Sequence, residues 1–403
     1  MPDAPGGRFF FYLALMEITH EKACLCALNR IFGFEPKIAL ALIAHFGSAS
    51  GVFALRPEEA DSILGPHSKY KGCICARTVE NAWTELEQLK LQGTEFIGWS
   101  EDAYPALLKE CEDAPSGLYL RTSSRPTELW NRSRFISVVG TRDLSPYGKE
   151  WCERLIHALA DAPEDERPVI VSGLAIGTDI CAHRTALECG LPTMAVMATG
   201  PDSIYPARHI PFAERIAGAS GSALVTDYPP GTAPLPVHFL RRNRIIAGLS
   251  EATVLIESKI KGGGMMTARL ADSYNREVFA LPGRVDDLRS QGCNFLIRSR
   301  TAHAITSIND FINDIGMTAG KRRPEVSCED RVRNLYKGNL PDDRISQMSG
   351  ILLAIRQERG ITIDEIAAKL GVEYHKISQL TGMLETDGII TVDLLQRCFI
   401  NFR

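Results

Sequence analysis

The 403-residue sequence lacks a long hydrophobic run, a C-x-x-C motif and an excess of positive charge. Its apolar amino-terminal patch, residues 9–16, is too short to cross a bilayer and is closed by Glu17, so we expect no membrane segment. Eleven cysteines without zinc-finger spacing favour buried thiols in the cytoplasm and predict neither a metal site nor a disulfide framework. Because 45 Lys and Arg face 49 Asp and Glu, any polyanion site must be a local patch.

Several catalytic signatures are also missing. No G-x-G-x-x-G follows the first predicted strand, no glycine loop ends in Gly-Lys-Ser or Gly-Lys-Thr, and no G-x-S-x-G occurs. These absences argue against dinucleotide redox chemistry, P-loop hydrolysis and a nucleophile elbow. His183 lies four residues after Asp179, and we interpret the two as a helix-stabilising pair rather than an acid–base couple. We therefore predict no catalytic residue and no cofactor.

The chain is long enough for two or three domains, and its first part differs from the rest. From residue 1 to 90, apolar residues recur at helical spacing between Gly33, Gly47 and Gly65, which predicts a domain of short helices. This pattern is similar to a SAM or helix-hairpin-helix unit, and a small helical packing domain is the alternative.

The middle of the chain, residues 91–318, changes to apolar runs that alternate with helical segments. The runs are rich in Val, Ile, Ala and Leu and lack strict alternation, so helices must cover both faces of their sheet. We therefore predict an α/β fold, a doubly wound parallel sheet of the Rossmann-like type. The predicted strands are 135–140, 168–173, 192–200, 222–228, 252–258 and 277–283.

The last part of the chain predicts a linker over residues 319–345 and a winged helix-turn-helix domain over residues 346–403. Thr362 begins a capped helix that ends at Gly371, and a second helix follows before an apolar strand pair. The domain holds six Lys and Arg against seven Asp and Glu. Because proteins that read duplex DNA usually carry a basic footprint, a protein-binding module is at least as well supported.

Three glycine-rich turns follow predicted strands, at the edge where open α/β sheets bind ligands. Glycine lets backbone N–H groups approach an anion, and Ser or Thr adds a hydroxyl donor. A single turn of this kind is a weak signal, and three in one sheet favour an anion site. The candidate residues in the turns are Gly140, Thr141 and Arg142, then Ser172, Gly173, Gly177 and Thr178, and finally Lys261, Gly263 and Thr267.

The segment from Phe239 to Ser250 is unusual in a net-negative chain, because three arginines fall within four residues. Guanidinium forks bind phosphate oxygens and an aromatic ring can stack on an unpaired base, which together suit single-stranded nucleic acid. The alternative is a solvated helix edge or pairing with acids such as Glu257. The candidate residues here are Phe239, Arg241, Arg242, Asn243 and Arg244.

These blocks, in this order, resemble the DprA or Smf family of DNA-processing proteins of bacterial natural transformation. The resemblance rests on Ser137–Arg142 with Ser145–Gly148, on Ser172–Asp179 with Ala182–His183, on Tyr205–Pro206 with Tyr228–Gly231 leading to Phe239–Ser250, and on Pro282–Gly283 with Ser290–Ile297. It implies an extended Rossmann-like domain that binds single-stranded DNA, forms a homodimer and helps to load a RecA-type recombinase onto incoming DNA, without catalysis. It also implies that Arg142 and Arg244 hold phosphates and that Phe239 contacts a base or sugar.

The sequence departs from the family pattern at three places. Leu240 stands where proline is usual, Thr178 where isoleucine is frequent, and Gly262–Gly264 where Ser-Gly-Ser is common. The last change removes two hydroxyl donors and keeps the backbone amides, so we expect the site to survive in altered detail.

Two other functions remain open at this stage. A nucleotide phosphoribohydrolase would need a catalytic glutamate after its glycine loop, and residues 261–272 contain none. A winged-helix transcription regulator would read duplex DNA with residues 346–403. A preference for duplex over single strand would favour the regulator.

Overall fold

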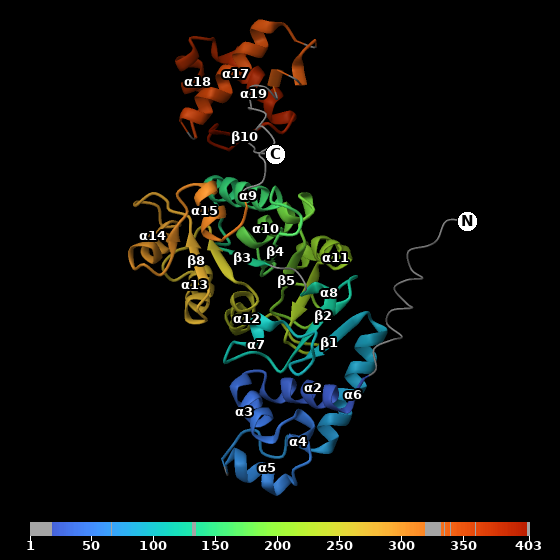
Figure 1. The fold of residues 1–403 in the computed structure, drawn as a ribbon. Helices are drawn as coiled ribbons and strands as arrows, with labels where there is room; N and C mark the ends of the chain where they lie inside the picture. The colour runs from blue at the N-terminus through green and yellow to red at the C-terminus, as the bar shows by residue number, and fades with distance from the viewer. Residues whose placement is uncertain are drawn as a thin grey trace, which may run out of the picture. The chain divides into compact units, whose positions relative to one another are not determined.

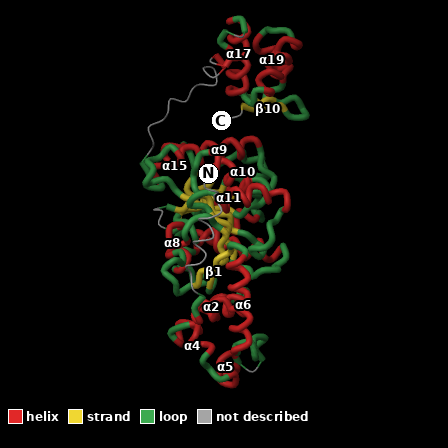
Figure 2. Tube along the Cα trace, turned by 90° about the vertical axis from the view of Figure 1, so that its right-hand side faces the viewer, coloured by secondary structure: helices red, strands yellow, loops and turns green. Residues whose placement is uncertain are grey.

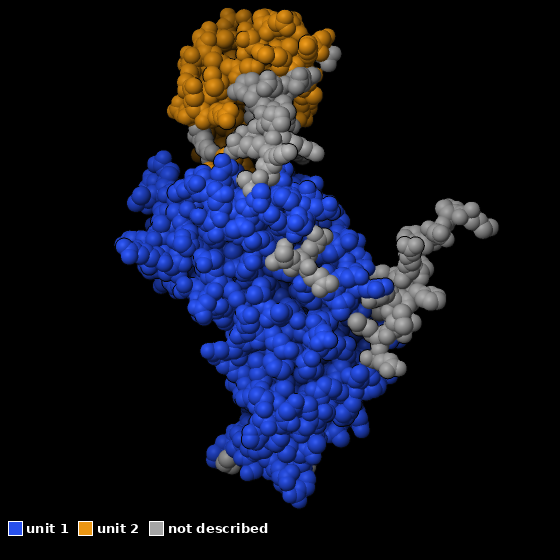
Figure 3. Space-filling model, viewed as in Figure 1, with its two compact units in different colours: residues 1–144, 155–318 blue, residues 145–154, 319–403 orange. Residues whose placement is uncertain are grey.

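The computed structural model describes residues 18–65, 67–130, 134–318, 332–333, 335–338, 340–358 and 360–400. The chain divides into two compact units (Figure 3), of which the first contains residues 1–144 and 155–318 and the second residues 145–154 and 319–403. Within the described ranges, no helix is both long and apolar enough to cross a membrane.

The first unit begins with a layer of helices, shown in blue in Figure 1. Thr19 caps the first of them by accepting a hydrogen bond from the backbone N–H of Lys22. Leu25, Leu28 and Phe32 are fully buried along one face of that helix and join the core of the layer. The assignment of this layer as a SAM or helix-hairpin-helix unit stays a prediction. The helices are α2 (His20–Phe32), α3 (Pro36–Phe46), α4 (Ala49–Phe53), α5 (Pro57–Leu64) and α6 (Ala76–Leu91).

A nine-stranded sheet forms the centre of the unit, in the order β1-β2-β6-β5-β4-β3-β7-β8-β9. All neighbours from β6 to β9 are parallel, and β1 and β2 add an antiparallel edge. The strands are β1 (Thr94–Gly98), β2 (Gly117–Arg121), β3 (Phe135–Val139), β4 (Val169–Ser172), β5 (Thr193–Val196), β6 (Ala223–Thr226), β7 (Ala252–Leu255), β8 (Glu277–Ala280) and β9 (His303–Ala304).

Helices lie on both sides of the strands, as Figure 2 shows. The chain runs outward from β3 to β6 and then returns to β7 on the other side of β3. Right-handed crossovers in opposite directions place their helices on opposite faces of the sheet. The helices are α7 (Ala106–Lys109), α8 (Pro126–Leu129), α9 (Pro146–Ala160, of which residues 155–160 belong to this unit), α10 (Thr178–Glu188), η1 (Ala207–His209), α11 (Ile210–Gly218), α12 (Pro236–Gly248), α13 (Gly263–Ser273), α14 (Gln291–Arg298) and α15 (Ile308–Asp314).

The predicted α/β fold with a large parallel sheet is confirmed. Each of the six predicted runs contains one of the strands β3 to β8. Strands β3 to β7 are buried at every position, which explains their continuous apolar sequence. The sequence reasoning missed β1, β2 and β9, which lie at the two edges of the sheet.

The second unit contains α17 (Asp342–Gln357), α18 (Ile363–Leu370) and α19 (Tyr374–Thr386), followed by the hairpin of β10 (Ile390–Val392) and β11 (Cys398–Ile400). Its winged helix-turn-helix assignment stays a prediction. Its folded part begins earlier than the predicted boundary at residue 346, because Val332 and Tyr336 are buried in the same core as the helices. The polar, Gly- and Pro-interrupted composition of residues 319–345 concealed this, because the helical spacing of Val332, Leu335 and Tyr336 is too short to stand out from it.

Candidate nucleic-acid interface

The carboxyl ends of β3 and β7 form the point at which the strand order reverses. In open α/β sheets the loops at such a reversal leave a crevice that binds ligands. The turn after β3 contains Gly140, Thr141 and Arg142, and the loop after β7 leads through Lys261 to the first residue of α13, Gly263. Two of the three predicted glycine turns therefore flank this reversal point.

Glycine is required where these two segments meet. A Cβ atom on Gly140 would stand 2.5 Å from Thr178 Oγ1 and 3.0 Å from the carbonyl oxygen of Glu257. A Cβ atom on Gly264 would stand 3.0 Å from the Cα atom of Gly140. The turn after β3 thus packs directly against the amino-terminal ends of α10 and α13, and larger side chains would push these segments apart.

The turn after β4 is held by its own hydrogen bonds rather than left open for an anion. The hydroxyl of Ser172 donates to the carbonyl of Val138 at 2.6 Å. Both the hydroxyl and the backbone N–H of Thr178 donate to the carbonyl of Thr141, at 3.2 and 3.1 Å. The prediction that Ser172 and Thr178 offer hydroxyl donors to a phosphate is therefore wrong, because those hydroxyls have backbone partners.

Two other residues of this region also have structural roles. Gly177 adopts a φ of +84°, which glycine tolerates and other residues rarely adopt. A Cβ atom at this position would also stand only 2.3 Å from the carbonyl oxygen of Thr141. His183 does not pair with Asp179 as predicted, because its Nδ1 lies 2.7 Å from the hydroxyl of Thr193. Burial lowers the pKa of His183 to about 3, so the imidazole is neutral.

Arg242 does not project from the sheet edge as the sequence suggested. Only 3% of the residue is exposed, and its guanidinium donates to the carbonyls of Gly173, at 2.6 Å, and Val196. A Cβ atom on Gly173 would overlap this guanidinium, so that glycine makes room for an arginine and not for a phosphate. Burial lowers the pKa of Arg242 to about 10, and the neighbouring carboxyl of Asp179 opposes this shift.

Arg244 is likewise a core residue, and its burial contradicts the prediction that it binds a phosphate. Its guanidinium forms an ion pair with the carboxylate of Asp227, and the two residues are 6% and 4% exposed. The same guanidinium donates to the carbonyl of Asp113 at 2.5 Å. The backbone carbonyl of Asp227 accepts from the Asn29 side chain at 2.7 Å. Arg244 therefore connects the loop after β6 with the segment before β2.

Arg241, the third arginine, fastens the helical layer to α12. Its guanidinium donates to the carbonyls of Gly33 and Phe34 and lies 4.2 Å from the centre of the Phe34 ring. A cation at the end of α2 is favourable for the helix dipole, and the ring adds a cation–π contact. None of the three arginines of this segment therefore presents a free guanidinium at the sheet edge.

The structure brings Arg142 and Phe239 together, and their predicted contacts with DNA stay a prediction. Arg142 is exposed, and its guanidinium lies 5.3 Å from the centre of the Phe239 ring. The ring of Tyr205, which is 47% exposed, meets Phe239 edge-on at 5.4 Å. These three side chains come from the loops after β3 and β5 and from α12. We call Arg142, Phe239 and Tyr205 the aromatic–arginine cluster.

The remaining predicted residues lie around the start of α13. Lys261 and Gly263 are exposed, whereas Thr267 is 2% exposed and faces the core. Asn243 is 8% exposed and its amide donates to the carbonyl of Gly263 at 3.5 Å. Sequence reasoning did not select Tyr205, Lys259 or Arg269 for the site. Lys259 is an exposed cation on the same loop as Lys261, and Arg269 is an exposed cation on α13, the helix that follows this loop.

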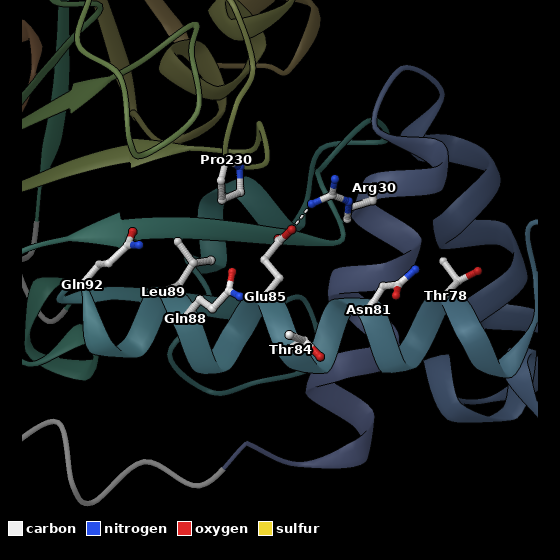
Figure 4. Close-up of a pocket in the computed structure, with 9 residues that line it drawn as sticks. All are labelled: Arg30, Thr78, Asn81, Thr84, Glu85, Gln88, Leu89, Gln92 and Pro230. Atoms are coloured by element: carbon white, nitrogen blue, oxygen red, sulfur yellow. Dashed lines mark ion pairs between the residues drawn. The ribbon is translucent and has the colours of Figure 1, made fainter.

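A separate pocket lies between α6, α2 and Pro230, as Figure 4 shows. Its lining along α6 consists mainly of neutral polar side chains, including Asn81, Thr84 and Gln88. Its one cation, Arg30, points at Glu85 and is paired with it. Because these opposite charges compensate each other, the pocket offers no net attraction to a polyanion.

The described residues contain no group of three or more His, Cys, Asp or Glu side chains that could hold a metal ion. The ten cysteines among them are free. The geometry at the sheet edge is thus one of exposed cations, an aromatic pair and two helix amino termini.

Residues 95–316 match the family model described as DNA recombination-mediator protein A. The chain belongs to this family. It is 29% identical to Protein Smf of Synechocystis over 392 residues, which cover 92% of this chain and 96% of that protein. It is 37% identical to the DNA processing protein DprA of Streptococcus pneumoniae over 258 residues, which cover 63% of this chain and 87% of that protein.

A solved structure agrees with this assignment. The X-ray structure of DNA processing protein A from Streptococcus pneumoniae matches with a TM-score of 0.59 and 29% sequence identity, over 74% of this chain and 99% of that chain. The resemblance seen in the sequence motifs is confirmed, and so is the membership of a family of DNA-processing proteins in recombination.

Proposed function

We propose that this protein binds single-stranded DNA at the carboxyl edge of its parallel sheet and does not cleave it. We further propose that it acts as a homodimer that protects incoming DNA in natural transformation and helps to load a RecA-type recombinase onto it. The observation that carries the first proposal is the aromatic–arginine cluster beside the reversal point between β3 and β7.

The chemistry of the cluster supports an unpaired strand over a duplex. In a duplex the base faces are stacked on each other and unavailable, whereas an unpaired base can stack on an exposed aromatic ring. Phe239 is half-buried and Tyr205 is 47% exposed, so both rings keep accessible surface next to a cation. Arg142 is free to bind a phosphate oxygen because it makes no ion pair with a described residue.

Part of the crevice supports a polyanion despite the net negative chain. Lys261 is exposed in the loop before α13 and Arg269 is exposed along that helix, and no carboxylate lines the groove that they share. The positive dipole end of α13 adds to the charge of Lys261. Lys259 adds less, because Asp143, Asp286 and Asp287 line the same pocket as its side chain. The absence of glutamate from residues 261–272 supports a binding role over glycosidic hydrolysis. Recombinase loading and dimerisation rest on the family and on the motif resemblance.

The decisive experiment measures binding of a fluorescent 20-nucleotide thymidine oligomer by anisotropy at several salt concentrations. We expect Arg142→Ala and Phe239→Ala each to weaken binding about 5- to 100-fold, because each removes a phosphate or a base contact. Arg142→Ala also reduces the slope of log K against log salt by about 0.7, the contribution of one neutralised phosphate on a single strand. Phe239→Ala leaves the slope unchanged.

The chain offers a matched control pair. On α11, the guanidinium of Arg215 lies 5.7 Å from the ring of Phe212, in the same kind of contact. Arg215 belongs to the last turn of α11, at the end of the helix that leads toward the amino edge of the sheet. Arg215→Ala should therefore bind DNA like the wild type. An equal loss of affinity in Arg142→Ala and Arg215→Ala would show a general charge effect and contradict the proposed site.

The partner proposals need separate readouts. Light scattering should give twice the 44.4 kDa mass of one chain if the protein is a homodimer. In a recombinase-loading assay, the wild type should shorten the lag before filament growth on single-stranded DNA and Arg142→Ala should not. A monomeric mass would refute the homodimer proposal. A lag that the wild-type protein leaves unchanged would refute the recombinase-loading proposal.

A further inference from the structure

An apolar groove of about 600 Å³ lies beside the aromatic–arginine cluster, where α12 and the start of α13 pack side by side (Figure 1). Its lining includes Leu240, Ile260 and Met266, which are 46%, 43% and 41% exposed. A folded protein does not gain from exposing three large apolar side chains together, so the groove needs an occupant.

The charge of the groove narrows the choice of occupant. Its ionisable lining residues are Lys261 and Arg269, both cations, and no carboxylate lines it. An apolar floor with a cationic rim fits a ligand that combines flat apolar faces with negative charge. Unpaired nucleotides have this chemistry, because each base offers an apolar face and each phosphate a charge.

The position of the groove favours the DNA strand over another ligand. Leu240 directly follows Phe239 on α12, and Lys261 and Gly263 belong both to the groove and to the loop that flanks the β3–β7 crevice. The groove therefore begins one residue from Phe239 along α12 and shares Lys261 and Gly263 with the loop of the crevice. Met266 suits such a floor, because a thioether adapts its shape and contacts aromatic faces favourably.

We propose that this groove is a second base-binding subsite for the same single strand. Leu240 and Met266 contact the face of an unpaired base, and Lys261 and Arg269 bind the phosphates on either side of it. The proposal rests on the proposed function, since it assumes that a strand occupies the neighbouring cluster. It adds residues outside the glycine turns and explains why leucine at position 240 and methionine at position 266 are exposed.

The test compares two probes of equal charge, a 20-nucleotide thymidine oligomer and a 20-nucleotide strand whose sugars carry no bases. The variant Leu240→Asn with Met266→Gln removes apolar contact and no charge. We expect it to weaken binding of the thymidine oligomer about 5- to 50-fold, to leave binding of the abasic strand unchanged, and to keep the salt slope. Lys261→Ala should weaken both probes and reduce the slope by about 0.7.

Leu353→Asn provides the matched control, because Leu353 is 49% exposed on α17 in the other unit. It should bind both probes like the wild type. Thermal unfolding of every variant confirms that its fold is intact, which is expected for substitutions of exposed side chains.

The outcomes separate this proposal from the proposed function. If the Leu240 and Met266 variant binds thymidine like the wild type while Arg142→Ala does not, the subsite is refuted and the cluster stands. If Arg142→Ala also binds like the wild type, the proposed function itself fails. If the groove variant keeps DNA binding and loses capture of a recombinase, the groove is a protein-docking surface and the base subsite is refuted.

Discussion

Removing the Arg244 guanidinium should lower the free energy of unfolding and should not remove a direct contact with DNA. The Arg244→Ala variant leaves the carboxylate of Asp227 buried and without its cation, since Asp227 is 4% exposed and its Oδ1 already has no hydrogen-bond partner. Breaking a buried ion pair in this way costs about 3–5 kcal/mol. It also frees the Asp113 carbonyl that accepts from Arg244.

Urea unfolding followed by tryptophan fluorescence measures this cost. Trp99 and Trp130 pack against the core of the sheet, so their emission reports on the unit that contains Arg244. With a loss of about 4 kcal/mol and a denaturant slope of about 3 kcal/mol/M, the midpoint falls by about 1.3 M. The double variant Arg244→Met with Asp227→Asn should recover most of the loss, because no buried charge remains.

Arg142→Ala is the comparison, because Arg142 is exposed and its removal should change the midpoint by less than about 0.2 M. The reasoning is refuted if Arg244→Ala unfolds like the wild type and loses DNA binding in the manner expected for Arg142→Ala. That result would mean that the Asp227 ion pair does not hold Arg244 in solution.

Three further measurements follow from the same structure. His183 is neutral in the folded protein and takes up a proton near pH 6.5 in the unfolded chain. The free energy of unfolding should therefore fall from pH 6.5 toward pH 3 by up to about 1.4 kcal/mol per pH unit. Urea titrations at each pH should show that the His183→Asn variant lacks this part of the pH dependence. Gly140→Ala should cost about 1–3 kcal/mol by overpacking against Thr178, whereas Gly263→Ala, whose Cβ would meet nothing within 4 Å, should leave the thermal midpoint unchanged. EDTA should alter neither the thermal midpoint nor DNA affinity, and a loss of either would reveal a metal site.

The sequence predicted the sheet well because its strands are buried on both faces. Continuous apolar runs such as Phe135–Val139 have few other interpretations when helical segments alternate with them. The edge strand β1 was missed because it precedes the alternating pattern of apolar runs and helical segments. Strand β9 has two residues, which is too little for any periodicity to appear.

The residues predicted for the candidate site were partly misassigned in detail. The glycine turns do lie at one edge of the sheet, because the carboxyl ends of parallel strands meet there whichever side chains they carry. The three arginines of α12 misled the reasoning, since a sequence does not show that Arg244 meets Asp227 or that Arg242 meets the carbonyl of Gly173. Long-range partners of this kind decide whether a charged side chain is a ligand or a core residue.

Tyr205 shows the opposite case. Tyr205–Pro206 belongs to the motif blocks that carry the family resemblance, but nothing in its local sequence marks Tyr205 as a partner of Phe239. Only the fold brings the loop after β5 to the start of α12. A search for exposed aromatic residues in loops that follow parallel strands would have found it. Such residues share the ligand-binding edge of the sheet with the glycine turns.

Photocrosslinking tests the central claim most directly. A thymidine oligomer that carries 5-iododeoxyuridine is irradiated with the protein, and the attached peptide is identified by mass spectrometry. We predict attachment at Phe239 or Tyr205, loss of that product in the Arg142→Ala variant, and recovery of the oligomer at full length. Attachment confined to the α19 helix of the second unit, or an oligomer returned in pieces, would contradict the account.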